Sequence, residues 1–170
     1  MFELGDYIIY ANTGVCRIEE ICVPEGFGSE NKLYYKLKPA FKPEIVFIPV
    51  DSAVYMRKVL TKKEALDFID SIPEIAEDES AAGLDNKSLQ LHYTAFLNTH
   101  ECSTLAQLIK TIRTKEKDLA EKGKKLIKTD ADFMQKAKDI LHGELSISLG
   151  IPVEEVASFI EARLGQKLNA

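Results

Sequence analysis

Residues 5–21 read GDYIIYANTGVCRIEEI and hold two short apolar runs separated by Asn12-Thr13-Gly14. Both runs are rich in Ile, Val and Tyr, which are enriched in β-strands. Glycine in the intervening turn allows the positive φ angles that a tight connection requires. The stretch therefore predicts a β-hairpin. The alternation in the second run is imperfect, and it predicts that this strand bends near its middle.

The two-residue period continues to about Val59, through KLYYKLKPA (32–40) and EIVFIPV (44–50). The connections PEGFGSEN (24–31) and FKP (41–43) contain the Gly and Pro residues that are typical of turns. We expect Gly5, Gly14, Gly26 and Gly28 to lie in turns. Short strands joined in this way predict a small antiparallel barrel or a strongly bent sheet.

After Val59 the period changes to that of a helix. Thr61 is followed three residues later by Glu64, which predicts a capping box at a helix start. The acidic segment 73–85 is interpreted as a linker or an exposed loop. Helices are then predicted at residues 86–98, 103–115, 116–122, 130–149 and 153–165, with Gly123, Gly150 and Gly165 as terminators.

The helix predicted at 130–149 is expected to be central to the helical part. Its apolar residues Phe133, Met134, Ala137, Ile140, Leu141, Leu145 and Leu149 fall on one side. Lys136, Lys138 and Glu144 are expected to face outward. In the preceding segment, Tyr93 and Phe96 recur at helical spacing and are expected to be buried, with His92 at the boundary.

The predicted fold is thus α+β, in two domains. Residues 1–59 form a β domain, residues 60–85 a helix and acidic linker, and residues 86–170 an all-α domain.

The sequence argues against several classes of protein. The chain has 170 residues, 45% of them hydrophobic, yet no apolar run is long enough for a membrane span, and we see no secretion signal. Cys16, Cys22 and Cys102 lack C-x-x-C spacing, which indicates reduced and mostly buried thiols rather than a disulfide framework or a zinc ribbon. A cytoplasmic protein is expected.

We find no phosphate-binding loop, dinucleotide fingerprint, nucleophile elbow or H-E-x-x-H motif. The nearest approach to a metal site is His92, His100 and Cys102, but solvation of His100 at a helix end and burial of Cys102 explain those residues better. The acidic pairs at 77–79 and 154–155 lack apolar enclosure and are interpreted as solvated charge. We predict no catalytic residue, cofactor or metal, and a protein that is not an enzyme.

Basic residues are crowded into one stretch although the net charge is −5. They are Lys110, Arg113, Lys115, Lys117, Lys122, Lys124, Lys125 and Lys128. One interpretation is a solvated helix face with i,i+4 ion pairs such as Lys117 with Glu121. The other is contact with the phosphates of a nucleic acid, which is independent of sequence and weakens steeply with salt.

Together, several segments resemble the CarD/CdnL family of bacterial transcription regulators. They are residues 2–21, YYKL (34–37), FIPVDSA (47–53), LAQLIKTIRTKEKD (105–118) and KAKDILHGELS (136–146). The resemblance implies a Tudor-like, SH3-like β domain that docks on the β subunit of RNA polymerase, as does a related domain of the transcription-repair coupling factor. It also implies a helical domain that contacts promoter DNA at the upstream edge of the melted region. The expected partners are therefore the polymerase β subunit and promoter DNA, with no membrane and no small-molecule substrate.

The polymerase contact is expected at edge strands, because an edge can accept a strand from another protein. We assign it to Cys22, Val23, Pro24, Glu25, Ile45, Val46, Phe47 and Ile48. Family members carry a basic residue at the position of Phe47, so either the polymerase contact is apolar here rather than a salt bridge, or it lies elsewhere.

In the helical domain many family members carry a tryptophan that wedges against a base step, with arginines after it. This chain has no Trp. The Trp position falls near Asn86, and the arginines become Ser88 and Leu89. DNA contact is therefore assigned to Asn86, Lys87, Lys110, Arg113, Lys122, Lys124, Lys125 and Lys136. The alternative is an interaction module that binds polymerase without touching DNA.

Overall fold

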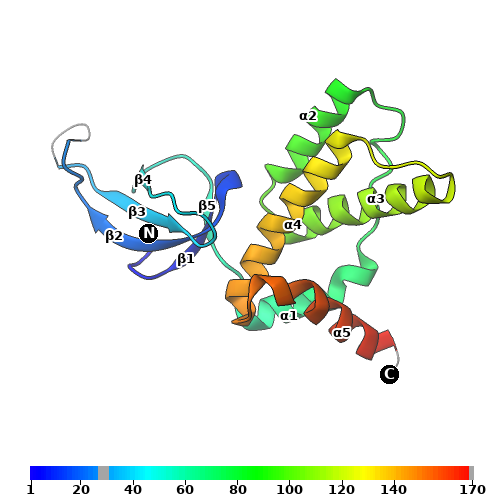
Figure 1. Ribbon diagram of the computed structural model, residues 1–170. Coiled ribbons are helices and arrows are strands. Elements are labelled where there is room, and N and C mark those ends of the chain that lie inside the picture. The colour runs from blue at the N-terminus through cyan, green and yellow to red at the C-terminus, as the bar shows by residue number, and fades with distance from the viewer. Residues whose placement is uncertain (27–30, 169–170) are drawn as a thin grey trace.

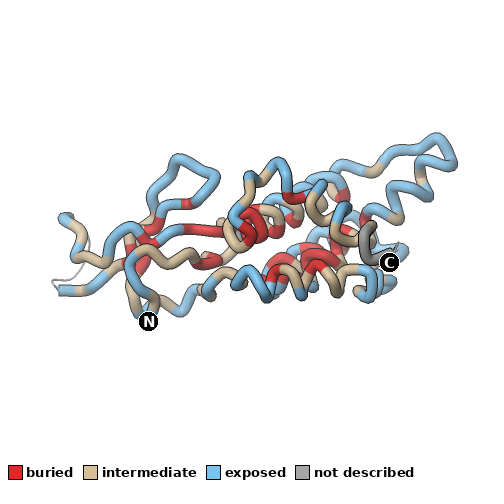
Figure 2. Tube along the Cα trace, turned by 90° about the horizontal axis from the view of Figure 1, so that it is seen from below, coloured by how far each residue is buried: buried red, intermediate tan, exposed pale blue. Residues whose placement is uncertain are grey.

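The computed structural model describes residues 1–26 and 31–168. An N-terminal antiparallel sheet is followed by a helical part, which is the α+β arrangement expected from the sequence (Figure 1). Each part has its own buried cluster of apolar residues. Figure 2 shows the buried segments in the interior of the two parts, with exposed chain around them.

The sheet has five strands in the order β4-β3-β2-β1-β5, all antiparallel. They are β1 (Tyr7–Tyr10), β2 (Gly14–Cys22), β3 (Tyr34–Pro39), β4 (Val46–Pro49) and β5 (Met56–Lys58). Within the described chain β4 and β5 do not pair with each other, so the sheet is open rather than a closed barrel. The sequence did not indicate β5 as a separate strand, because three residues are too few to show a period.

The predicted hairpin is confirmed as β1 and β2, joined by a 3-10 turn at Ala11–Thr13. Gly14 ends this turn with φ of 90°. The register of β2 against β3 shifts between Ile18 and Glu20, which confirms the predicted irregularity in the middle of this strand. Gly5 and Gly26 also have positive φ, and Gly28 lies outside the described residues.

The helical part begins at α1 (Lys62–Ser71), whose capping box of Thr61 and Glu64 is present as predicted. A short 3-10 turn, η2 (Ile72–Glu74), leads into the acidic segment, which contains no α-helix. The remaining elements are α2 (Asn86–Leu97), α3 (Cys102–Glu121), α4 (Lys128–Leu149), η3 (Val153–Glu155) and α5 (Val156–Leu168).

Two predicted helix boundaries are wrong. The helices expected at 103–115 and 116–122 are one continuous α3, because no helix-breaking residue separates them. Gly165 lies inside α5 rather than at its end. Gly123 and Gly150 have φ of 68° and 69° and follow α3 and α4, so their prediction as terminators is confirmed.

As predicted, α4 is central to the helical part. Its residues Ala137, Leu141, Leu145 and Leu149 are buried, and it contacts α1, α2, α3 and α5. One end of α4 lies beside α2, and the other lies near α1, α5 and the sheet (Figure 1). The helix that organises the core therefore also reaches the sheet.

Glu144 connects α4 to the sheet, and the expectation that it faces outward is wrong. Its side chain is 1% exposed and accepts hydrogen bonds from Arg57 of β5, at 2.6 Å from Nη1 to Oε1 and 2.8 Å from Nη2 to Oε2. The backbone N–H of Leu60 donates to Oε1 at 3.0 Å, and the Cys102 thiol donates to Oε2 at 3.2 Å. The side of α4 that carries Glu144 faces the sheet, and Arg57 supplies the charge that its burial requires.

Arg57 also binds the start of α3. Its Nε and Nη2 donate to the carbonyl of His100 at 3.2 Å and 2.9 Å. Burial by itself would lower the pKa of Arg57, but the hydrogen bonds and charge of Glu144 outweigh it and raise that pKa. His100 is buried with φ of 58°, so its expected solvation at a helix end is wrong, whereas the burial of Cys102 is confirmed. We call Arg57, His100, Cys102 and Glu144 the joint.

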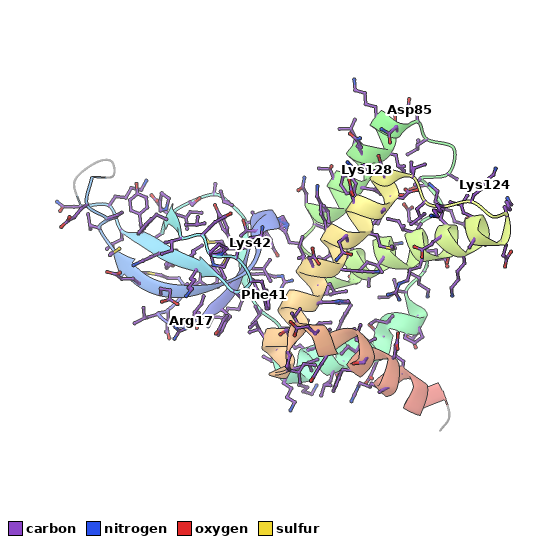
Figure 3. The ribbon with its side chains drawn as sticks, viewed as in Figure 1. Arg17, Phe41, Lys42, Asp85, Lys124 and Lys128 are labelled. Atoms are coloured by element: carbon purple, nitrogen blue, oxygen red, sulfur yellow. The ribbon has the colours of Figure 1, made fainter. Side chains whose placement is uncertain are left out.

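A second contact lies beside the joint. A Cβ atom at Gly143 would lie 3.1 Å from the ring of Phe41, which belongs to the connection between β3 and β4. Figure 3 shows Phe41 between the sheet and α4. Consecutive residues of α4 therefore meet two different segments of the N-terminal part.

The joint predicts strong coupling between Arg57 and Glu144. Arg57→Met leaves a buried carboxylate without its cation and should lower the free energy of unfolding by about 3 kcal/mol. Glu144→Leu should cost somewhat less, because the Arg57 side chain is 20% exposed and can turn toward water. The double variant should recover more than half of the summed loss, since no unpaired charge remains.

Urea unfolding of the four proteins measures this coupling. Lys63→Met is the matched control, because Lys63 pairs with Asp67 on the exposed face of α1. It should change the free energy of unfolding by less than about 0.5 kcal/mol. Single-variant losses that simply add in the double variant would contradict the predicted role of the pair.

Candidate functional site

The outer edge of the sheet at β4 is the first candidate surface. In the described chain β4 pairs with β3 only, through Leu37–Val46, Lys36–Phe47, Tyr35–Ile48 and Tyr34–Pro49. An edge strand can extend its ladder to a strand of another protein. Ile45, directly before β4, is 54% exposed, while Val46 and Phe47 are half-buried. Ile48 is buried in the core of the sheet, so it supports the edge from inside.

The edge expected at residues 22–25 is wrong. Cys22 is the last residue of β2 and pairs with Tyr34, and β2 lies between β1 and β3. Val23, Pro24 and Glu25 follow β2 in the connection toward β3, where Val23 is exposed. The other edge of the sheet is β5, whose Arg57 enters the joint. Of the two edges, β5 is thus already bound to the helical part.

The predicted DNA-binding residues fall in several places. Asn86 and Lys87 open α2 and are exposed, and the Thr129 hydroxyl donates to Asn86 Oδ1 at 2.6 Å. This bond joins the start of α2 to the start of α4, where Figure 3 shows Asp85 and Lys128 at the same end of the helical part. Asp85 caps α2, and hydrogen bonds from Ser88 and Lys87 lower its pKa. Asp85 therefore places an anion beside Lys87.

The exposed connection between α3 and α4 carries Lys122, Lys124 and Lys125. Lys124 lies at the end of the helical part that is far from the sheet (Figure 3). Of the predicted basic residues, those in this loop lie closest together in the sequence, and all three are exposed.

The remaining predicted residues lie elsewhere. Lys110 Nζ donates to the carbonyl of Ile75 at 2.7 Å, so this lysine holds the acidic segment against α3. Arg113 is exposed one turn further along α3. Lys136 of α4 is exposed, with Nζ 5.1 Å from the centroid of the Phe133 ring. Within the basic stretch, the Lys115 ammonium pairs with Asp130 at 2.7 Å.

Asp130 is a buried acid that the sequence did not reveal. It is fully buried at the start of α4 and also accepts a hydrogen bond of 2.7 Å from the Tyr93 hydroxyl. Burial raises the pKa of Tyr93, and the hydrogen bond to Asp130 raises it further. The predicted burial of Tyr93 is confirmed. Lys115 therefore supports the packing of α2, α3 and α4 instead of facing solvent as a free cation.

The weak metal candidates do not come together. His92 Nε2 lies 2.5 Å from Asp78 Oδ2, whereas Cys102 belongs to the joint. Among the described residues we find no group of three His, Cys, Asp or Glu side chains arranged to hold a metal ion. None of the described helices is long and apolar enough to span a membrane.

Comparison with known proteins identifies the class of the sheet. Residues 2–60 match the model of the CarD-like/TRCF RID domain, a family of RNA-polymerase-interacting domains. The match covers β1 to β5 and includes Arg57, the residue that the sheet contributes to the joint. No curated protein matched the chain.

Residues 2–60 of this protein therefore belong to the CarD-like/TRCF RID domain family. The resemblance inferred from the sequence is confirmed for this region.

Proposed function

We propose that the chain is a non-enzymatic transcription regulator of the cytoplasm that docks on the β subunit of RNA polymerase and contacts promoter DNA. The observation that carries the proposal is the match of residues 2–60 to the CarD-like/TRCF RID domain family. The sheet formed by these residues has an edge strand, β4, that can pair with a strand of another protein. We infer that this sheet is a variant of the Tudor-like, SH3-like docking domain. The helical part, beyond the family match, is then the part that contacts DNA.

Docking is proposed to occur by strand addition along β4. Backbone hydrogen bonds would supply affinity, and side chains beside the edge would supply specificity. Ile45 is the most exposed apolar residue at this edge, so it is the side chain best placed for an apolar contact. An apolar contact is also consistent with Phe47, which stands where members of the CarD/CdnL family carry a basic residue.

DNA contact is proposed to rest on the lysines that are open to solvent, chiefly Lys87, Lys122, Lys124 and Lys125. Lysines bind phosphates without reading bases, so affinity for free DNA should be low and sensitive to salt. Docking on polymerase raises the local concentration of DNA around the helical part. Binding one initiation intermediate more tightly than others would shift the population toward that intermediate.

A second candidate function is an interaction module that binds polymerase without touching DNA. Three observations favour it: the net charge of −5, the absence of Trp, and the position of Asp85 beside Asn86 and Lys87. The two candidates differ in how binding responds to salt.

The docking surface is tested by Ile45→Glu. A carboxylate at the exposed end of β4 should weaken binding to polymerase or to its β subunit at least tenfold, because burying an unpaired charge costs more than about 1.4 kcal/mol. Leu4→Glu is the matched control, since Leu4 is 67% exposed and lies outside the strands. Pull-down and titration with fluorescent protein measure both. Equal binding by the two variants would place the docking surface elsewhere.

DNA contact is tested by titrating salt against binding to a forked promoter duplex. Each phosphate contact should contribute about −0.9 to the slope of log K against log salt, so Lys124→Gln with Lys125→Gln should make the slope shallower by roughly 1.8. Lys63→Gln, which changes a lysine of α1 paired with Asp67, should leave it unchanged. A flat response of the unaltered protein, or no binding at low salt, would favour the interaction module.

A further inference from the structure

A pocket opens on the helical part, and all the residues that line it lie outside the family match. It lies between η2, α3, α4 and α5 and has a volume of about 440 Å³. Its apolar lining includes Ala106, Ile109, Leu141, Ile160 and Leu164. Volumes of about 300–1,000 Å³ with mostly apolar walls are typical of sites for small molecules.

The α3 side of the pocket is basic. Lys110, Arg113 and Lys117 follow at helical spacing along it. Lys110 is occupied by the carbonyl of Ile75, but Arg113 and Lys117 form no ion pair with any part of the chain that the structure describes. Arg113 is therefore a cation at the mouth of an apolar pocket, and no carboxylate of the described residues is paired with it.

The α4 side of the pocket carries Leu141 and His142. His142 lines the pocket, and burial lowers its pKa, with the charges of Lys138 and Arg113 lowering it further and that of Asp139 opposing them. Two acids lie at the rim: Glu77, which accepts a hydrogen bond of 2.6 Å from the Thr114 hydroxyl, and Glu161 of α5. Glu161, which is not hydrogen-bonded to α3, thus lies on the side of the pocket formed by α5.

We propose that this pocket binds a small organic anion with an apolar body, whose carboxylate or sulfonate pairs with Arg113 while its apolar part packs against Ile109 and Ile160. A guanidinium with free donors binds such groups in two-point geometry, and apolar walls strengthen the attraction by excluding water. A nucleic acid backbone offers no apolar group to fill the floor of the pocket. The volume suits one small molecule rather than a protein segment.

The ligand class is tested with 4-phenylbutyrate and its neutral analogue 4-phenylbutan-1-ol, followed by NMR of methyl groups in the intact protein. The anion should give saturable shifts at Ile109, Ile160 and Leu164 at millimolar concentration or below, and should bind roughly fivefold or more tightly than the alcohol. The absence of saturable shifts for the anion, or equal affinity of the two compounds, would overturn the proposal.

Three variants locate the site. Arg113→Gln should remove the preference for the anion. Ala157→Phe places a ring in the pocket from an exposed position of α5 and should abolish binding of both compounds. Lys124→Gln is the control with the same loss of charge outside the pocket, and it should change nothing. Unchanged affinity in Arg113→Gln or Ala157→Phe would overturn the proposal. The proposed DNA contact is tested separately, through the salt response at Lys124 and Lys125, so it can fail or hold independently of this result.

Discussion

The arrangement of this protein depends on one buried carboxylate. Glu144 accepts hydrogen bonds from both terminal nitrogens of Arg57, from the backbone of Leu60 and from the thiol of Cys102. A carboxylate shielded from water is stable only when a cation and several donors replace its hydration. Those groups belong to β5, the chain after β5, and α3, so one residue of α4 ties these three segments together.

This constraint determines where the candidate surfaces lie. Edge β5 is held against the helical part, which leaves β4 as the edge that can accept a partner strand. The same helix that carries Glu144 begins at the lysine-rich connection after α3. Docking along β4 would therefore fix the direction in which those lysines point. Under the proposed function, the joint is what would hold polymerase and DNA in a defined geometry.

The sequence predicted the parts of the fold that depend on local pattern. The hairpin at residues 7–22, the capping box at Thr61 and the apolar stripe of α4 follow from period, turn chemistry and capping, and all three are confirmed. Strand order is different, because it depends on which distant segments pair. The sequence therefore could not show that Cys22 lies in an interior strand, and a strand as short as β5 has no period to detect.

Charged residues were the least predictable. The sequence predicts that Glu144 faces solvent and gives no sign that Asp130 is buried, because an acid on a helix is usually exposed. Each buried acid is paired with a cation from another element. Glu144 pairs with Arg57, which is 87 positions away in the sequence, and Asp130 pairs with Lys115 of the neighbouring helix. Likewise, nothing in the basic stretch of α3 and its loop indicates that Lys110 and Lys115 bind groups of other segments whereas Lys124 is exposed.

Residual dipolar couplings of the backbone amides test most directly whether the joint holds the sheet and the helical part as one body. Couplings from β1 to β5 and from α1 to α5 should fit a single alignment tensor in the unaltered protein. In Glu144→Leu the two sets should require separate tensors while each part keeps its fold. Two unequal tensors in the unaltered protein would contradict a fixed joint.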